Sequence, residues 1–387
     1  MKSIFNLDNL FATGFILASL YLVSFVKLPE FLEPIEATFE NLDISDIAFS
    51  KFRDLPGDTN IVIVNMGLIP RQGIADQIKI INQYKPKVIG IDVFFRNEKG
   101  FEEDTPLQDA FSEVENLVLV SKVWNYNEET GYWDTLETSH SKFNQYASTG
   151  FANLVPHRLE TSRVFRPIQN LKDRSELHFA VKIAQIYNPR VVDKLLSREN
   201  TLEVINYRGN KEFYKLDVLQ IFDTNQDLSF LKDKIVLMGF MGRNFSDTSW
   251  HDKLFTPLNP EFVGRSYPDM YGVVIHANII SMIVNGDFIE KKDTLSMILS
   301  IILCFFNVAF FSYIYKIHRQ WYDGTTFLIG IVETVVIFFC SLFLFYYFAI
   351  KVNVTFLIVA FLLMSNLLEV YYSVFKNIAI SVKRKFF

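Results

Sequence analysis

Residues 234–259 have the sequence KIVLMGFMGRNFSDTSWHDKLFTPLN, and residues 267–289 have the sequence YPDMYGVVIHANIISMIVNGDFI. The first stretch opens with a short run of β-forming apolar residues, 235–240, which is typical of a buried strand that ends in a loop. In the second stretch Val273, Ala277, Ile280 and Val284 have helical spacing, and Asn285-Gly286 supplies a left-handed stop. The sequence therefore predicts a strand, a polar loop and a helix directly before an apolar region.

The same alternation of strand and helix runs through the preceding residues. Segments 61–64 (IVIV), 88–95 (VIGIDVFF) and 117–123 (LVLVSKV) are rich in β-formers, and helical spacing separates them. Strands joined by single amphipathic helices favour crossover connections, so we expect an α/β fold with a largely parallel, Rossmann-like sheet and flanking helices. Weaker patterns predict strands at 150–154, 163–168 and 202–207, helices at 177–187 and 216–222, and an insertion or hairpin at 124–148.

Composition restricts the classes of function. Half of the residues are hydrophobic and 39 are Phe, which is high for a soluble protein. The net charge is −5, and no basic run with interleaved aromatics lies outside the membrane flanks, so we expect no nucleic-acid partner. Both cysteines, Cys304 and Cys340, lie in apolar runs, which leaves the α/β region without a disulfide framework.

Four apolar segments predict four transmembrane helices. Three of them, at 294–315, 325–349 and 352–372, are long enough to cross about 30 Å of hydrocarbon. The first, at 10–26, is near the lower length limit. We expect an uncleaved anchor there because Asp8 lies where a signal peptide would carry basic residues, and a cleaved signal peptide is the alternative.

The predicted domains are an N-terminal anchor (1–27), an α/β domain (28–293), three transmembrane helices (294–375) and a basic tail (376–387). Basic residues lie at three places that flank the apolar segments: Lys2 at the start, the loop at 316–319, and the tail. The positive-inside rule then predicts that both termini lie in the cytoplasm and that the α/β domain lies outside the membrane.

Stretches spread over most of residues 45–290 carry a family resemblance, and they include PRQGIADQI, VIGIDVFF, RVFRPI, INYRGN, LKDKIVLMGF and YGVVIHANIISMIVNGDFI. Their order resembles the type-two CHASE domain (cyclases/histidine kinases associated sensory extracellular). The resemblance implies a periplasmic sensory domain on a multi-pass protein of a bacterial inner membrane. An N-terminal span and three closing spans also match the layout of that family.

Two features depart from the family pattern. Members carry acidic residues and a Trp-Pro-Trp-Pro-Arg stretch after the first strand, whereas the corresponding run here is NMGLIPRQ, which keeps only Pro70-Arg71. Members also continue into a cyclase, kinase or phosphodiesterase domain, whereas this sequence ends about fifteen residues after its last predicted span. We therefore expect the protein to act through another polypeptide.

We expect no catalytic residue, no metal and no cofactor. The sequence contains no phosphate-binding loop, nucleotide-binding glycine fingerprint or nucleophile elbow. Its histidines lack the paired spacing of zinc ligands.

Five residues are ligand-binding candidates because a doubly wound sheet would gather them at the carboxyl ends of its strands: Arg71, Asp92, Asp247, Asp252 and His276. Each has an alternative role. For Asp92 the alternative is a carboxylate that caps its own loop by bonding to backbone amides, as Asp commonly does. Asp247 and Asp252, with His251, either hold a hard cation or stabilise their loop by hydrogen bonds. His276 heads an apolar helix, where a buried core histidine is common.

Polar residues inside the apolar segments form a second set of candidates: Asn307, Glu333, Asn366 and Glu369. An ionisable group such as Glu333 costs ~2.5–3.5 kcal/mol within a membrane unless it is paired or protonated. We expect these residues to assemble helices. A proton path and simple interfacial positioning are the alternatives for Glu333.

The sequence thus predicts a non-enzymatic integral membrane protein with an extracytoplasmic sensory or interaction domain. We expect it to be a subunit of an envelope membrane-protein complex. The alternative is a receptor that signals through a separate kinase, cyclase or regulator, and an enzyme or stand-alone transporter is a third class. The expected partners are lipid, other membrane or envelope proteins, and an unidentified small-molecule ligand.

Overall fold

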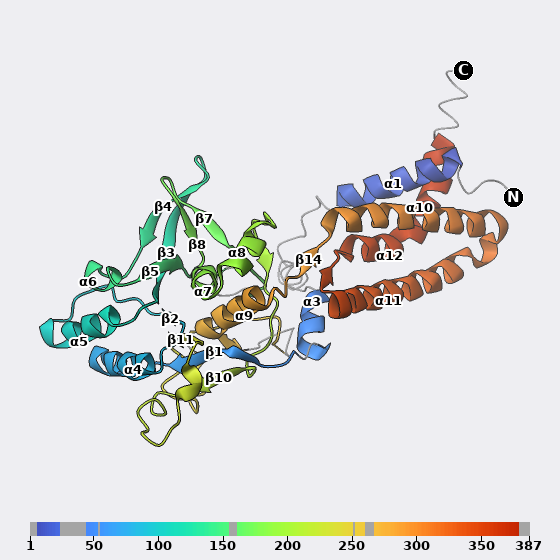
Figure 1. Cartoon of the computed structure of the whole chain (residues 1–387). Helices are drawn as coiled ribbons and strands as arrows, with labels where there is room; N and C mark the ends of the chain where they lie inside the picture. The colour runs from blue at the N-terminus through green and yellow to red at the C-terminus, as the bar shows by residue number, and fades with distance from the viewer. Residues whose placement is uncertain are drawn as a thin grey trace. The chain divides into compact units, whose positions relative to one another are not determined.

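The computed structural model describes residues 6–23, 44–52, 55–154, 161–250, 252–259 and 267–378. The chain divides into two units. Phe49–Ile289 form an α/β unit, and Met1–Ala48 together with Glu290–Phe387 form a helical unit (Figure 1). The mixed α/β architecture with apolar helices is therefore confirmed.

A mostly parallel sheet organises the α/β unit. Its strand order is β10-β1-β11-β2-β3-β4, and β5 pairs with β3. Among the described strands of this sheet only β4 runs antiparallel to its neighbour. The Rossmann-like arrangement is not confirmed, because β11 lies between β1 and β2. The strands are β1 (Asp58–Asn65), β2 (Val88–Ile91), β3 (Leu117–Asn127), β4 (Tyr132–Glu137), β5 (Ser148–Phe151), β10 (Phe213–Leu216) and β11 (Ile235–Gly239).

Helices cover both faces of the sheet (Figure 1). The helices α4 (Arg71–Gln83) and α5 (Phe101–Ser112) bury Ile78 and Phe111 in one core with β1, β2 and β11. On the other face lie α7 (Phe179–Tyr187) and α9 (Gly272–Asn285). A Cβ at Gly239 would lie 2.7 Å from the Cβ of Val273, so β11 and α9 pack closer than any larger side chain permits.

Shorter elements complete the unit. The predicted hairpin at 124–148 is present as the antiparallel pair β3–β4, followed by α6 (Ser141–Asn144). Helix α8 (Pro189–Leu196) follows α7, with Asn188 capping it and proline in its first turn. The remaining elements are β6 (Val164–Phe165), β7 (Ile168–Asn170), β8 (Ser175–Leu177), β9 (Glu203–Val204), η3 (Ser229–Leu231), β12 (Lys253–Leu254) and β13 (Met270–Tyr271).

Two predicted elements differ from the structure. The helix predicted at 216–222 is wrong: Phe213–Leu216 form β10 against β1, and a turn follows. Asp217 favours that turn because its carboxylate accepts the N–H of Val218 while its own N–H binds the side chain of Gln220. The strand predicted at 88–95 ends at Ile91, and farther along the N–H of Phe95 donates to the side chain of Ser139 rather than to a neighbouring strand.

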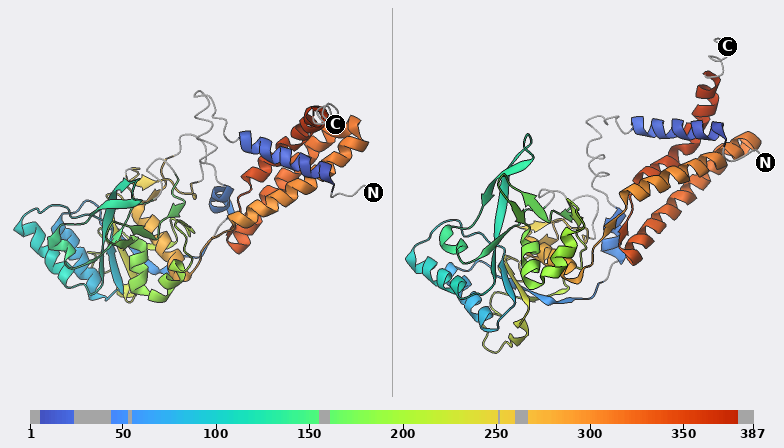
Figure 2. Two further views of the ribbon diagram at one scale, coloured as in Figure 1. Left: turned by 90° about the horizontal axis from the view of Figure 1, so that it is seen from above. Right: turned by 45° about the horizontal axis from the view of Figure 1, so that its top comes forward.

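In the described residues of the helical unit, four apolar helices pack side by side (Figure 2). They are α1 (Leu7–Val23), α10 (Asp293–Ile317), α11 (Tyr322–Phe348) and α12 (Thr355–Val370), and shorter elements are α3 (Ile44–Ile47), η2 (Ala48–Phe52, which crosses the unit boundary), β14 (Glu290–Lys291), η4 (Arg319–Trp321), β15 (Ile350–Lys351) and η5 (Tyr371–Phe375).

Three of these helices are long and apolar enough to cross a membrane, namely those within Asp293–Ile317, Arg319–Phe348 and Thr355–Ile378. At 17 residues α1 spans only about 26 Å, just below the usual hydrocarbon thickness. Residues 24–26 of the predicted first span lie outside the described residues. The fourth transmembrane helix therefore stays a prediction.

Candidate functional site

Three of the five predicted ligand-binding residues lie around the start of α9. A Cβ on Gly272 would lie 3.7 Å from Oδ2 of Asp92. A Cβ on Gly242 would lie 3.0 Å from both the Cβ of Asp247 and the hydroxyl of Tyr271. The pKa of Tyr271 is raised by burial and by the negative charges of Asp247 and Asp252. Asp92 therefore lies beside Gly272, and Asp247 and Asp252 lie on the side of the Tyr271 hydroxyl, beside the carboxyl ends of β2 and β11.

The carboxylates of Asp247 and Asp92 differ in their hydrogen bonds and in their pKa values. The carboxylate of Asp247 accepts the N–H groups of Arg243 at 3.0 Å and Ser249 at 2.9 Å, and these bonds lower its pKa. In the described part of the chain the carboxylate of Asp92 makes no hydrogen bond, and burial raises its pKa to about 7. Asp247 thus caps its own loop, whereas Asp92 does not. His251 lies outside the described residues, and the described ones contain no cluster of three or more metal-binding side chains.

Arg71 and His276 do not join these acids. Arg71 forms a buried ion pair with Asp104, and its guanidinium lies 5.0 Å from the centroid of the Phe143 ring. His276 is buried within α9, 5.3 Å from the ring of His178, and burial lowers its pKa to about 3. Arg71 therefore anchors α4 to α5, and His276 is a core histidine.

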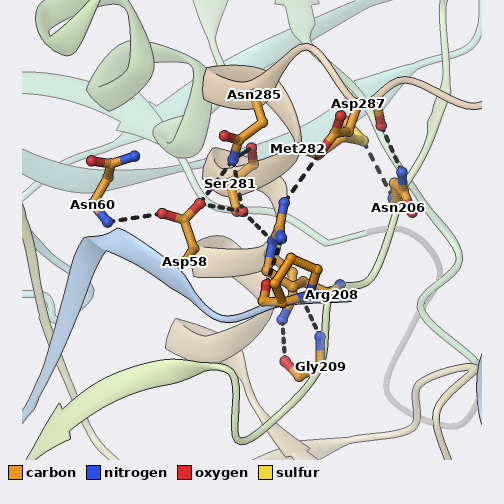
Figure 3. Close-up of polar contacts among 11 residues, drawn as sticks. Asp58, Asn60, Asn206, Arg208, Gly209, Ser281, Met282, Asn285 and Asp287 are labelled. Atoms are coloured by element: carbon orange, nitrogen blue, oxygen red, sulfur yellow. Dashed lines mark hydrogen bonds and ion pairs between the residues drawn. The ribbon is translucent and has the colours of Figure 1, made fainter. Parts of the chain in front are cut away.

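A second polar cluster lies on α9, and sequence reasoning did not identify it (Figure 3). Nη1 of Arg208 donates to the carbonyl oxygen of Pro56 at 2.6 Å, and Nη2 donates to Oδ2 of Asp287 at 3.1 Å. Its Nε donates to Oγ of Ser281 at 2.9 Å, and Ser281 donates to Oδ2 of Asp58 at 2.5 Å. We name Arg208, Ser281, Asp58 and Asp287, with the Pro56 carbonyl, the Arg208 clasp.

Neighbouring amides hold the clasp in place. Oδ1 of Asn278 accepts the backbone N–H of Arg208 at 2.8 Å and that of Gly209 at 3.1 Å. Nδ2 of Asn285 donates to Asp58 at 2.9 Å, and Nδ2 of Asn206 donates to the carbonyl oxygen of Asp287 at 2.7 Å. The side chain of Arg208 is only 9% exposed, so these partners replace most of its water.

The clasp joins the two ends of the α/β unit. Pro56 and Asp58 lie at the entry to β1, and Asp287 follows the last turn of α9. Beyond Asp287, Arg198 donates to the carbonyl oxygen of Ile289 at 3.1 Å and lies over the ring of Phe288. What this arrangement can do is hold the two chain connections together.

A sequence signal for the clasp did exist. Asn278, Ser281 and Asn285 form a polar stripe at helical spacing on an otherwise apolar helix. Arg208 lies in the INYRGN stretch, between a short strand and a turn. The spacing marks the stripe, but only the folded chain shows which arginine meets it.

Of the four polar candidates in the apolar helices, two bind each other and two are exposed. Asn307 of α10 donates to Oε2 of Glu333 in α11 at 2.6 Å. Asn366 and Glu369 lie three residues apart on an exposed face of α12. At one end of the unit Asp8 accepts hydrogen bonds from Lys316 at 2.9 Å and Lys376 at 2.7 Å.

The chain also matches a known protein family. A model of the CHASE2 domain matches residues 44–314, which include the whole α/β unit and most of α10. The chain belongs to the CHASE2 domain family. No curated protein and no solved structure matches it significantly. A CHASE2 sensory domain followed by three apolar helices makes this chain a membrane protein of the sensor type.

Proposed function

We propose that this CHASE2 protein is a membrane sensor that transmits the state of its α/β unit through the Arg208 clasp. The observation that carries the proposal is the double contact of one guanidinium, with the Pro56 carbonyl at the entry to the unit and with Asp287 at its exit. Only residues 290–292 separate Ile289 from α10. A shift of Arg208 therefore acts on the chain directly before a membrane helix. The protein acts by binding, without catalysis and without a cofactor.

Buried charge makes the clasp suited to switching between discrete states. Arg208 faces two acids, Asp58 through Ser281 and Asp287 directly. The side chain of Arg208 is 9% exposed and that of Asp287 is 46% exposed, so removing Asp287 leaves a mostly buried guanidinium without its direct ion-pair partner. Half-broken arrangements are thus disfavoured, and the contacts change together.

The sensor lies in a bacterial inner membrane, with the α/β unit in the periplasm and both termini in the cytoplasm. Ion pairs in the helical unit support this topology. Because Asp8 binds Lys316 and Lys376, the start of α1 and the ends of α10 and α12 lie at one end of the helical unit. That end carries the basic residues that the positive-inside rule assigns to the cytoplasm.

A second candidate function is that of a subunit in an envelope membrane-protein complex. The exposed pair Asn366 and Glu369 favours it, because polar side chains on the outer face of an apolar helix promote association with another helix. The two functions share an outside domain that binds a ligand or a protein. They differ in the partner, which is a kinase, cyclase or regulator for the sensor.

Amide hydrogen exchange of the full chain in lipid nanodiscs tests the clasp. We expect Arg208→Gln to raise exchange about tenfold both at residues 55–60 and at 286–292, while β11 keeps its protection. Arg243→Gln, at an arginine whose side chain is 79% exposed, is the control and leaves both segments unchanged. A rise at only one of the two segments contradicts the coupling role.

Purification in mild detergent, followed by mass spectrometry of co-eluting chains, separates the two functions. Co-elution of a kinase, cyclase or response regulator supports the sensor, and co-elution of other envelope proteins supports the complex subunit. Association lost in Asn366→Ala with Glu369→Ala, but retained in Val359→Ala on the same exposed face, assigns the contact to the polar pair. A chain that elutes alone in every condition contradicts both functions.

A further inference from the structure

A hollow of about 690 Å³ lies on the α/β unit, away from both the acids around α9 and the Arg208 clasp. The β3–β4 hairpin forms one wall, β7 with the residues before it forms the second, and the end of α8 with the turn after it forms the third. Its volume is in the range that holds a small organic molecule. Three elements that are distant in the sequence thus build one concave surface that is open to solvent.

Flat apolar side chains line part of this hollow. The rings of Tyr126 and Trp133 lie on the paired strands of the hairpin, 5.3 Å apart at an angle of 55°. Tyr126 is 54% exposed. Leu195 and Leu196 of α8 face the same space. A flat apolar ligand would remove this surface from water.

Arg166 supplies the charge of the hollow. It is half-buried, and in the described part of the chain its guanidinium has neither a hydrogen bond nor an ion pair. By contrast, Arg71 is paired with Asp104 and Arg198 with Glu203 in the same unit. Glu199 also lines the hollow, but it is exposed, so solvent screens its charge.

We infer that this hollow is the ligand-binding site of the sensory domain and that it takes a small organic carboxylate with a flat apolar body. The two carboxylate oxygens accept two parallel N–H bonds from the guanidinium of Arg166, which is the bidentate geometry that arginine favours. The flat body packs on Tyr126 and Trp133. This inference rests on the proposed sensor function, since it names the class of ligand that the sensor detects.

Isothermal titration of the full chain in nanodiscs tests the site with three probes. Phenylacetate has both features of the ligand, phenylacetamide lacks the charge, and acetate lacks the flat body. We expect phenylacetate to bind with an affinity at least about tenfold higher than that of either other probe, a difference of about 1.4 kcal/mol. Equal binding of phenylacetate and phenylacetamide, or no saturable binding of phenylacetate, overturns the assignment.

Variants identify the residue responsible. Arg166→Gln weakens phenylacetate binding about tenfold, Trp133→Leu weakens it independently, and Arg174→Gln leaves it unchanged. Arg174 is a matched control because it lies on the turn between β7 and β8 and pairs with Glu176 outside the hollow. An unchanged melting temperature shows that each variant is folded. Binding that is insensitive to both Arg166→Gln and Trp133→Leu overturns the site.

The two proposals fail in different ways. If phenylacetate binds through Arg166 but hydrogen exchange at 286–292 does not respond, the pocket stands and transmission through the clasp fails. If Arg208→Gln loosens both chain connections but no carboxylate binds, the clasp stands and the pocket fails.

Discussion

Asp92 and His276 are titratable residues of the α/β unit, the first half-buried and the second buried, and their contributions to stability change with pH in opposite directions. Burial raises the pKa of Asp92 from 3.8 to about 7. Between these values the folded chain keeps a proton that the unfolded chain has lost, so this contribution to stability falls as the pH rises. Burial lowers the pKa of His276 from 6.5 to about 3, so its contribution is complete above pH 6.5 and is lost on acidification toward pH 3.

Replacing Asp92 with Asn removes the cost of a buried carboxylate. We expect Asp92→Asn to stabilise the folded chain at pH 8 by on the order of 2 kcal/mol and to have little effect at pH 4.5, where the carboxyl is already protonated. Thermal unfolding in detergent at the two pH values measures the difference. Asp134→Asn, at an exposed position of β4, is the control and shows no such pH dependence. Equal effects of Asp92→Asn at both pH values contradict the raised pKa.

At the scale of elements, helix α9 connects the sheet, the clasp and the acids. It packs on β11 through its apolar side, holds the clasp through Ser281, and begins beside Asp92. Its apolar run, its start and its stop were predictable because they depend on residues close in sequence, including Gly286 with a positive φ of 68°. The helix predicted at 216–222 is wrong at its first residue because Leu216 ends β10, whose partner β1 is about 150 residues away.

Close packing between β11 and α9 gives an element-scale prediction. Gly239→Ala places a methyl group 2.7 Å from the Cβ of Val273, so we expect a loss of about 1–3 kcal/mol and a melting temperature several degrees lower. Gly272→Ala is the control on the facing helix, since its methyl group meets only Oδ2 of Asp92 at 3.7 Å. Melting temperatures that are lowered equally by both substitutions contradict the close approach.

At the scale of the whole molecule, the paired ends of the helical unit predict one topology. A fluorescent reporter fused after Phe387 is expected to fluoresce in the cytoplasm, and alkaline phosphatase fused after Ile289 is expected to be active in the periplasm. Asp8 and its lysine partners give the reason, because they bring the chain start and the basic tail region to one end of the unit. An inactive phosphatase after Ile289 contradicts the predicted topology.

The sequence alone determined the α/β class, the largely parallel sheet, the three closing apolar helices and the CHASE2 family, because these depend on local periodicity and on the order of short motifs. The tertiary structure decided which polar residues meet. Arg71, predicted as a ligand-binding residue, forms an ion pair with Asp104. Arg166 and Arg208 were not predicted as site residues, yet Arg166 lines the hollow and Arg208 forms the clasp. The physical reason is that a side chain's partners depend on long-range strand order, here the insertion of β11 between β1 and β2, which local sequence does not encode.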